Sequence, residues 1–124
     1  MRHATPTLTD QELEIMKVVW DLGTATVRDV YEKLLQHRHI AYTTVLTMMK
    51  ILETKGHLKK TQTERAYVYR PSKPKKQVIA GMVREFVNRV FNGSAEPLLV
   101  HLLEDEGLTA KELAEIARLA GRKS

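Results

Sequence analysis

The chain has 124 residues, with 20 lysines and arginines against 15 aspartates and glutamates, which gives a formal net charge of +5. It has no cysteine, and this excludes disulfides, thiolate metal sites and thiol redox sensing. No run approaches the roughly 18 apolar residues of a membrane span, and the first residues, MRHATPTLTD, lack the apolar core of a signal peptide. Because 43% hydrophobic residues suffice for a packed core, we expect a folded, soluble, cytoplasmic protein without membrane insertion.

Positive charge is concentrated in the middle of the chain. Residues 26–70 carry nine basic and four acidic side chains, and residues 71–92 carry five and one. Acidic side chains are in excess in residues 1–25 and 93–124. A surface that faces phosphates requires such a concentration, although an evenly solvated basic face accounts for it equally well.

Two helices are expected near the N-terminus, and a threonine begins each of them. The run from Thr9 to Glu12 matches a capping box, and the apolar residues that follow at helical spacing stop at Gly23. Thr26 can cap a second helix, which ends in the polar stretch 36–39.

A third helix is expected from about Tyr42 to Lys55, and Gly56 can close it in a left-handed turn. The residues predicted to face the core are Val45, Met48, Met49 and Leu52. Another face carries Thr43, Thr47, Lys50 and Thr54, bordered by Thr44 and Leu46.

After this helix the residue types change to Thr, Tyr and Val, which favour strands. Two short strands are therefore expected at 58–62 and 66–71, around a basic turn that contains Arg65. Tyr67 and Tyr69 are predicted to pack in the core beneath this hairpin.

Prolines mark the end of the first lobe, and the remainder reads as helical. We therefore expect two domains, residues 1–72 and residues 73–124. The second carries more apolar helix surface than a short helical hairpin can cover, which usually indicates a partner. A twofold homodimer is expected in preference to a monomeric cap folded onto the first domain. The candidate dimerisation residues are Val78, Ile79, Met82, Val83, Phe86, Val90, Leu99 and Leu103.

Three helices followed by a two-stranded hairpin form the winged helix-turn-helix order, a mainly α fold that places its third helix in the DNA major groove. Threonine has a lower helix propensity than alanine, so three threonines at the start of the third helix call for an explanation. Either they contact DNA, or one caps the helix and the others are solvated. The candidate DNA-binding residues are Tyr42, Thr43, Thr44, Thr47 and Lys50 in the third helix, and Lys59, Lys60 and Arg65 in the hairpin.

Three segments of the chain resemble the BlaI/MecI penicillinase-repressor family, which also includes the CopY copper regulators. They are TLTDQELEIMKVVWDLGTATVRDVYEKL, AYTTVLTMMKILETKGHL and ERAYVYRP. The resemblance implies a homodimer that represses transcription at a palindromic operator on double-stranded DNA, and in β-lactamase systems a membrane sensor protease that triggers cleavage in the C-terminal lobe. By motif, it assigns Thr43, Thr44, Thr47 and Lys50 to the recognition helix, Arg65 to the wing, and the helix that begins near Lys75 to the dimerisation arm.

The chain departs from the family's pattern in two places. The copper-responsive members carry a cysteine-rich C-terminal motif, which this sequence lacks. The penicillinase repressors are cleaved at an Asn–Phe bond in the fifth helix, and alignment on Asn92-Gly93-Ser94 places His101-Leu102 there. The sequence therefore leaves release by proteolysis, by a ligand or by turnover open.

Two functions other than DNA binding are an enzyme and a module that only docks proteins. An enzyme is disfavoured because no carboxylate pair or nucleophile motif accompanies the histidines, and no cofactor is expected. A metal site at His37 and His39 is much less common than a solvated loop pair. The remaining histidines are scattered, at His3, His57 and His101. A winged helix that only docks proteins is the alternative function, and it would favour an apolar third helix and a neutral or acidic wing.

Overall fold

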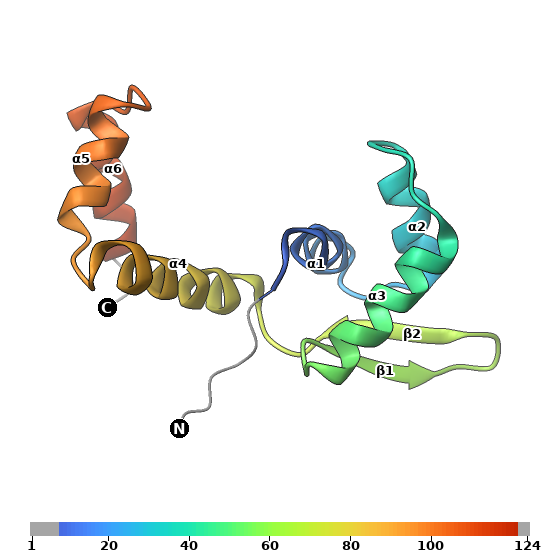
Figure 1. Ribbon diagram of the computed structural model, residues 1–124. Coiled ribbons are helices and arrows are strands. Elements are labelled where there is room, and N and C mark those ends of the chain that lie inside the picture. The colour runs from blue at the N-terminus through green and yellow to red at the C-terminus, as the bar shows by residue number, and fades with distance from the viewer. Residues whose placement is uncertain (1–7, 122–124) are drawn as a thin grey trace. The chain divides into compact units, whose positions relative to one another are not determined.

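The computed structural model describes residues 8–121 (Figure 1). In this part of the chain the order is α1 (Asp10–Leu22), α2 (Val27–Leu35), α3 (Tyr42–Thr54), β1 (Leu58–Gln62), β2 (Tyr67–Pro71), α4 (Lys75–Phe91), α5 (Glu96–Glu104) and α6 (Ala110–Gly121). The fold is mainly helical, and three helices precede an antiparallel hairpin. The winged-helix order predicted from the sequence is therefore confirmed.

The chain forms two compact units, of which the first ends at Ile79 and the second begins at Ala80. The division between them falls within α4. A boundary between folding domains after residue 72 stays a prediction.

Reciprocal capping begins the first two helices. The Thr9 hydroxyl accepts a hydrogen bond from the Glu12 amide at 3.1 Å, and the Glu12 carboxylate accepts one from the Thr9 amide at 3.0 Å. Thr26 and Asp29 form the same pair of bonds at the start of α2, both 3.0 Å long. Each box satisfies amides that the first turn leaves without a partner, so both predicted helix starts are confirmed.

The core of the first unit lies between α1, α2, α3 and the hairpin. Its fully buried side chains are Ile15, Met16, Val19, Val30, Leu34, Val45, Met49, Leu52, Leu58 and Tyr69. Met48, predicted to face inward with its neighbours on α3, is half-buried. Tyr69 is held further by two backbone hydrogen bonds with Ala25, which add a short bridge to the edge of β2. The hairpin is thereby fixed to the helices at its base.

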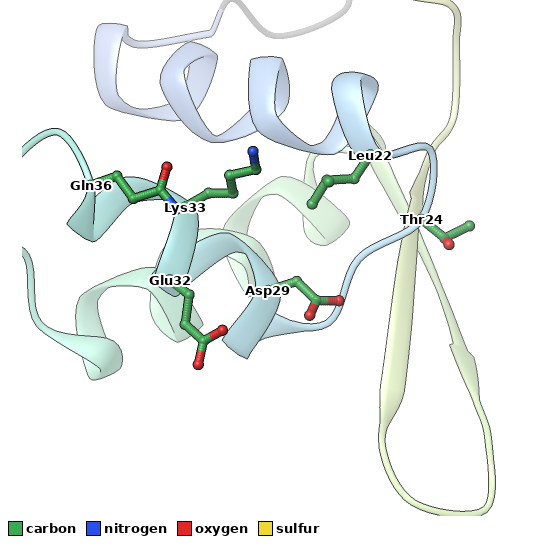
Figure 2. A pocket seen from close by; sticks show the side chains of 6 residues that line it. All are labelled: Leu22, Thr24, Asp29, Glu32, Lys33 and Gln36. Atoms are coloured by element: carbon green, nitrogen blue, oxygen red, sulfur yellow. The ribbon is translucent and has the colours of Figure 1, made fainter.

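The register of the hairpin decides which wing residues face the core. Because side chains alternate along a strand, Lys60 lies on the face of Tyr69, its cross-strand partner, while Lys59 and Arg70 share the opposite face. Tyr67 is on the Tyr69 face but is 47% exposed, so the prediction that it packs in the core was wrong. Tyr67 lies nearer the turn, and the turn reaches past the helices in both views (Figures 1 and 2).

The second unit buries little of its own apolar surface. No side chain of α4 or α5 is buried. Within the unit, the Phe91 ring packs edge-on against Phe86, at 5.8 Å between centroids, and lies 6.3 Å from the His101 ring. Among the side chains of this unit whose exposure the structure describes, the exposed large apolar ones are Val83, Phe86, Val90, Leu99, Val100 and Ile116. Four of these six, Val83, Phe86, Val90 and Leu99, were predicted dimerisation residues.

Candidate nucleic-acid interface

The candidate site begins with the polar side of α3. Tyr42, Thr43, Thr44, Thr47 and Lys50 are all exposed, as a groove-binding helix requires. We call Thr43, Thr44 and Thr47 the threonine face. Ile51, at the far end of the same helix, is also 40% exposed and was not among the sequence-based candidates.

The threonine face does not serve to cap α3. The N-cap residue is Ala41, which makes no side-chain hydrogen bond to the helix. Among the described residues, the hydroxyls of the threonine face have no hydrogen-bond partner, unlike the capping hydroxyls of Thr9 and Thr26. These three hydroxyls and their methyl groups are therefore free to contact another molecule.

The outer face of the wing carries two unpaired positive charges. Lys59 and Arg70 are direct cross-strand partners, and both are exposed. Neither forms an ion pair with any residue that the structure describes. Like charges directly opposite each other destabilise a hairpin, and a bound anion would remove that cost. Sequence reasoning missed Arg70, although the period of two along each strand and the short turn suggest its pairing with Lys59.

Lys60 points the other way, toward α3. Its Nζ lies 3.5 Å from Oε1 of Glu53 and 4.3 Å from the centroid of the Tyr67 ring. Burial raises the pKa of Tyr69, and the positive charge of Lys60 on the same face partly opposes that effect. Lys60 therefore joins the wing to α3 within the protein.

Arg65 lies in the turn of the hairpin, which Thr63 organises. The Thr63 hydroxyl donates to the Ala66 carbonyl at 2.8 Å and accepts from the amides of Ala66 and Arg65, at 3.2 and 3.4 Å. The Arg65 residue is exposed, and its guanidinium makes no ion pair in the described part of the chain. The wing thus presents a cation at its tip, on an ordered turn.

Outside this surface, a shallow hollow lies between the end of α1 and one side of α2 (Figure 2). It is lined by Leu22, Thr24, Asp29, Glu32, Lys33 and Gln36. Asp29 already caps α2, and no histidine lines the hollow.

Within residues 8–121, no group of three or more histidines, aspartates or glutamates could hold a metal ion; His3 lies outside the described residues. No helix described here is long and apolar enough to cross a membrane.

A three-helix core closed by an antiparallel hairpin, with the polar side of the third helix exposed, defines a winged-helix protein. The chain belongs to the penicillinase repressor family, whose model matches residues 8–122. This family consists of transcriptional repressors, which are not enzymes. The sequence resemblance to BlaI and MecI is thereby confirmed.

Individual relatives agree with this assignment. The chain is 29% identical to the penicillinase repressor of Bacillus licheniformis over 114 residues, which cover 92% of this chain and 89% of that protein. It is 34% identical to the transcriptional regulator BlaI of Mycobacterium tuberculosis over 102 residues, covering 81% and 74%. Its structure is similar to the solution structure of monomeric Bacillus licheniformis BlaI in complex with the blaP half-operator. The TM-score is 0.52 and the identity 30%, over 59% of this chain and 89% of that chain.

Proposed function

We propose that this protein is a repressor that binds double-stranded DNA as a homodimer at a palindromic operator. The observation that carries the proposal is the threonine face of α3, exposed and without a hydrogen-bond partner among the described residues. Short hydroxylated side chains let a helix approach base edges closely, and their methyl groups can meet the thymine methyl. Tyr42 and Lys50 would flank these contacts on the same helix.

The wing supplies the sequence-independent part of binding. Lys59 and Arg65, predicted from the sequence, would lie near phosphates or in the minor groove, and the exposed Arg70 opposite Lys59 would join them. Lys60 would contribute less to phosphate binding, because its ammonium already forms an ion pair with Glu53. BlaI of Bacillus licheniformis, which binds the blaP half-operator, supports this mode of binding for a chain that shares its fold.

Dimerisation rests on α4 and α5. Val83, Phe86 and Val90 follow one another along α4 and leave their apolar side chains exposed, and α5 adds Leu99. A second copy would cover this surface, joined by the remaining candidates, Val78, Ile79, Met82 and Leu103. Two recognition helices related by a twofold axis match an operator with two inverted half-sites. Such a repressor acts where the DNA is, in the cytoplasm.

Relief of repression by a membrane sensor protease belongs to the same proposal. His101 and Leu102 stand in α5 where the resemblance expects an Asn–Phe bond, so the protease would have to accept a different bond. Intact-mass spectrometry of the repressor from cells treated with a β-lactam tests this. A cut in the second unit supports proteolytic relief, whereas derepression with an uncut chain contradicts it.

Selection of DNA sites from a random library with the purified chain tests the main proposal. The enriched sequence should be an inverted repeat. Thr47→Ala should weaken binding to that sequence by about 1–3 kcal/mol and leave random duplex nearly unaffected. Thr24→Ala, which removes an exposed threonine beside the hollow of Figure 2, is the matched control. Failure to enrich any sequence, with no salt-sensitive binding to random duplex, would favour the protein-docking alternative.

A further inference from the structure

Arg28 lies in the first turn of α2 and contacts the residue that begins α3. The Cζ atom of its guanidinium is 5.9 Å from the centroid of the Tyr42 ring. Tyr31, on the next turn of α2, packs edge-on against the same ring, at 5.4 Å between centroids and an interplanar angle of 80°. The start of the proposed recognition helix thus meets α2 through one aromatic ring, with a cation over it.

Most of this guanidinium remains available to another molecule. Its Nη1 donates to Oε2 of Glu32 at 3.4 Å, and its other donors have no partner among the described residues. The side chain is 68% exposed. A solvent-exposed ion pair and an exposed cation–π contact are both weak. They can orient the Arg28 side chain, but they leave its guanidinium able to bind another group.

The position of Arg28 relative to α3 suggests what it binds. In a helix-turn-helix, the second helix enters the major groove while the first crosses the sugar–phosphate backbone. A cation on α2 that touches the first residue of α3 therefore lies where the groove meets its flanking phosphates. Arginine suits this position because its planar group can donate two parallel hydrogen bonds to a phosphate.

We propose that Arg28 binds a DNA phosphate beside the groove that α3 occupies, and that Tyr42 is the platform that holds its guanidinium in place. This inference rests on the proposed function and adds to it a contact outside α3 and the wing. Tyr42 then acts mainly by positioning Arg28, and its own contact with a base is not required.

A different role for Arg28 would be to neutralise Glu32, an acidic side chain on the same helix. The two roles separate in a double-mutant cycle with Glu32→Gln. If Arg28 only neutralises Glu32, then Arg28→Ala should have no effect on DNA binding once Glu32 is uncharged. If Arg28 binds phosphate, the loss should persist in that background.

The experiment measures binding of the full-length chain to a fluorescein-labelled random-sequence duplex, by anisotropy, between about 50 and 200 mM potassium chloride. Arg28→Ala should weaken binding about tenfold and reduce the salt slope by about 0.9 for each bound subunit. Arg28→Lys should restore the slope but only part of the affinity, since it keeps the charge and loses the planar group. Tyr42→Leu should weaken binding while leaving the slope nearly unchanged.

Lys33→Ala is the matched control, because it removes one positive charge from α2 on the side that lines the hollow of Figure 2. Thermal unfolding followed by circular dichroism should match wild type for the variants of Arg28, Glu32 and Lys33, as expected for exposed charged side chains. If wild type binds with a steep salt dependence and Arg28→Ala behaves like Lys33→Ala, the Arg28 assignment is wrong and the proposed function stands. If wild type shows no salt-dependent binding, both are overturned together.

Discussion

The ammonium of Lys55, the C-cap residue of α3, lies 2.8 and 3.0 Å from the two carboxylate oxygens of Glu12 in the first turn of α1. Glu12 is only 5% exposed, and the same carboxylate caps α1 through the Thr9 amide. A buried carboxylate needs such partners, because an unpaired one is costly to remove from water. This single side chain therefore couples the end of the proposed recognition helix to the start of α1.

Glu12→Gln should lower the free energy of unfolding by about 1–3 kcal/mol. Glutamine can still form the capping box, so the loss reports mainly the contact with Lys55. Urea unfolding at neutral pH measures it. Glu14→Gln is the control, since it removes the charge from an exposed pair with Arg38, which contributes less. Equal losses of unfolding free energy in the two variants would show that the burial of Glu12 does not strengthen its contact with Lys55.

The same carboxylate predicts a specific dependence of stability on pH. Burial raises the pKa of Glu12, but the hydrogen bonds from Lys55 and Thr9, with the charge of Lys55, outweigh burial and hold the pKa below its ordinary value of 4.5. A carboxyl whose pKa is lowered by folding stabilises the protein above its unfolded pKa, and this contribution is lost as the pH falls through the folded pKa. The difference in unfolding free energy between wild type and Glu12→Gln should therefore shrink below about pH 4.5. A constant difference over that range would contradict the assignment.

Gly56 follows the C-cap of α3 with a φ of +88°, a conformation that residues with a Cβ adopt at a cost. A Cβ built on it would meet nothing within 4 Å, so the cost is purely conformational. Gly56→Ala should destabilise the protein by about 1 kcal/mol, and Gly56→Asn by less, because asparagine tolerates the left-handed region. Denaturant unfolding of both variants measures this order, and the reverse order would show that the loop relaxes away from this conformation.

Features set by neighbouring residues could be predicted from the sequence. Thr9 with Glu12 and Thr26 with Asp29 satisfy each other within one turn, so the spacing alone determines the bonds. Gly56 likewise ends α3 through a local turn, one residue after the Lys55 cap. The exposure of the threonine face followed from the position of the apolar residues on the same helix.

Features that depend on packing between elements could not be predicted in this way. The strand period places Tyr67 and Tyr69 on one face, but only the extent of the helices beneath the hairpin decides that Tyr67 is exposed. The contact of Arg28 with Tyr42 depends on how α2 and α3 cross. The buried pair of Glu12 and Lys55 joins two elements far apart in the chain, and no spacing rule connects them.

The two neighbouring lysines of the wing should differ in their effect on DNA binding. Lys59→Ala should weaken binding to all duplexes to a similar degree and lower the salt slope by about 0.9 per subunit. Lys60→Ala should change the slope less, and should lower the free energy of unfolding by about 0.5 kcal/mol through loss of the contact with Glu53. Anisotropy on random duplex and thermal unfolding separate the two effects. A larger slope change for Lys60→Ala would mean that its ammonium leaves Glu53 for a phosphate.

Phe86→Asp should convert the proposed dimer to a monomer, because a charge in an apolar interface loses its water without gaining a partner. Sedimentation velocity should then give the mass of one 14.2 kDa chain, with Asn88→Asp, which places the same charge on another side of α4, still dimeric. Loss of the dimer should also weaken binding to an operator with two half-sites. In a dimer, binding of one subunit to its half-site holds the second subunit close to the other half-site, which raises the overall affinity by about 100-fold or more. A monomer binds each half-site independently and lacks this increase. Affinity for a selected inverted repeat should therefore fall by that factor, while affinity for an isolated half-site stays unchanged. A Phe86→Asp protein that remains dimeric, with unchanged binding to both DNAs, would place the dimer contact on another surface.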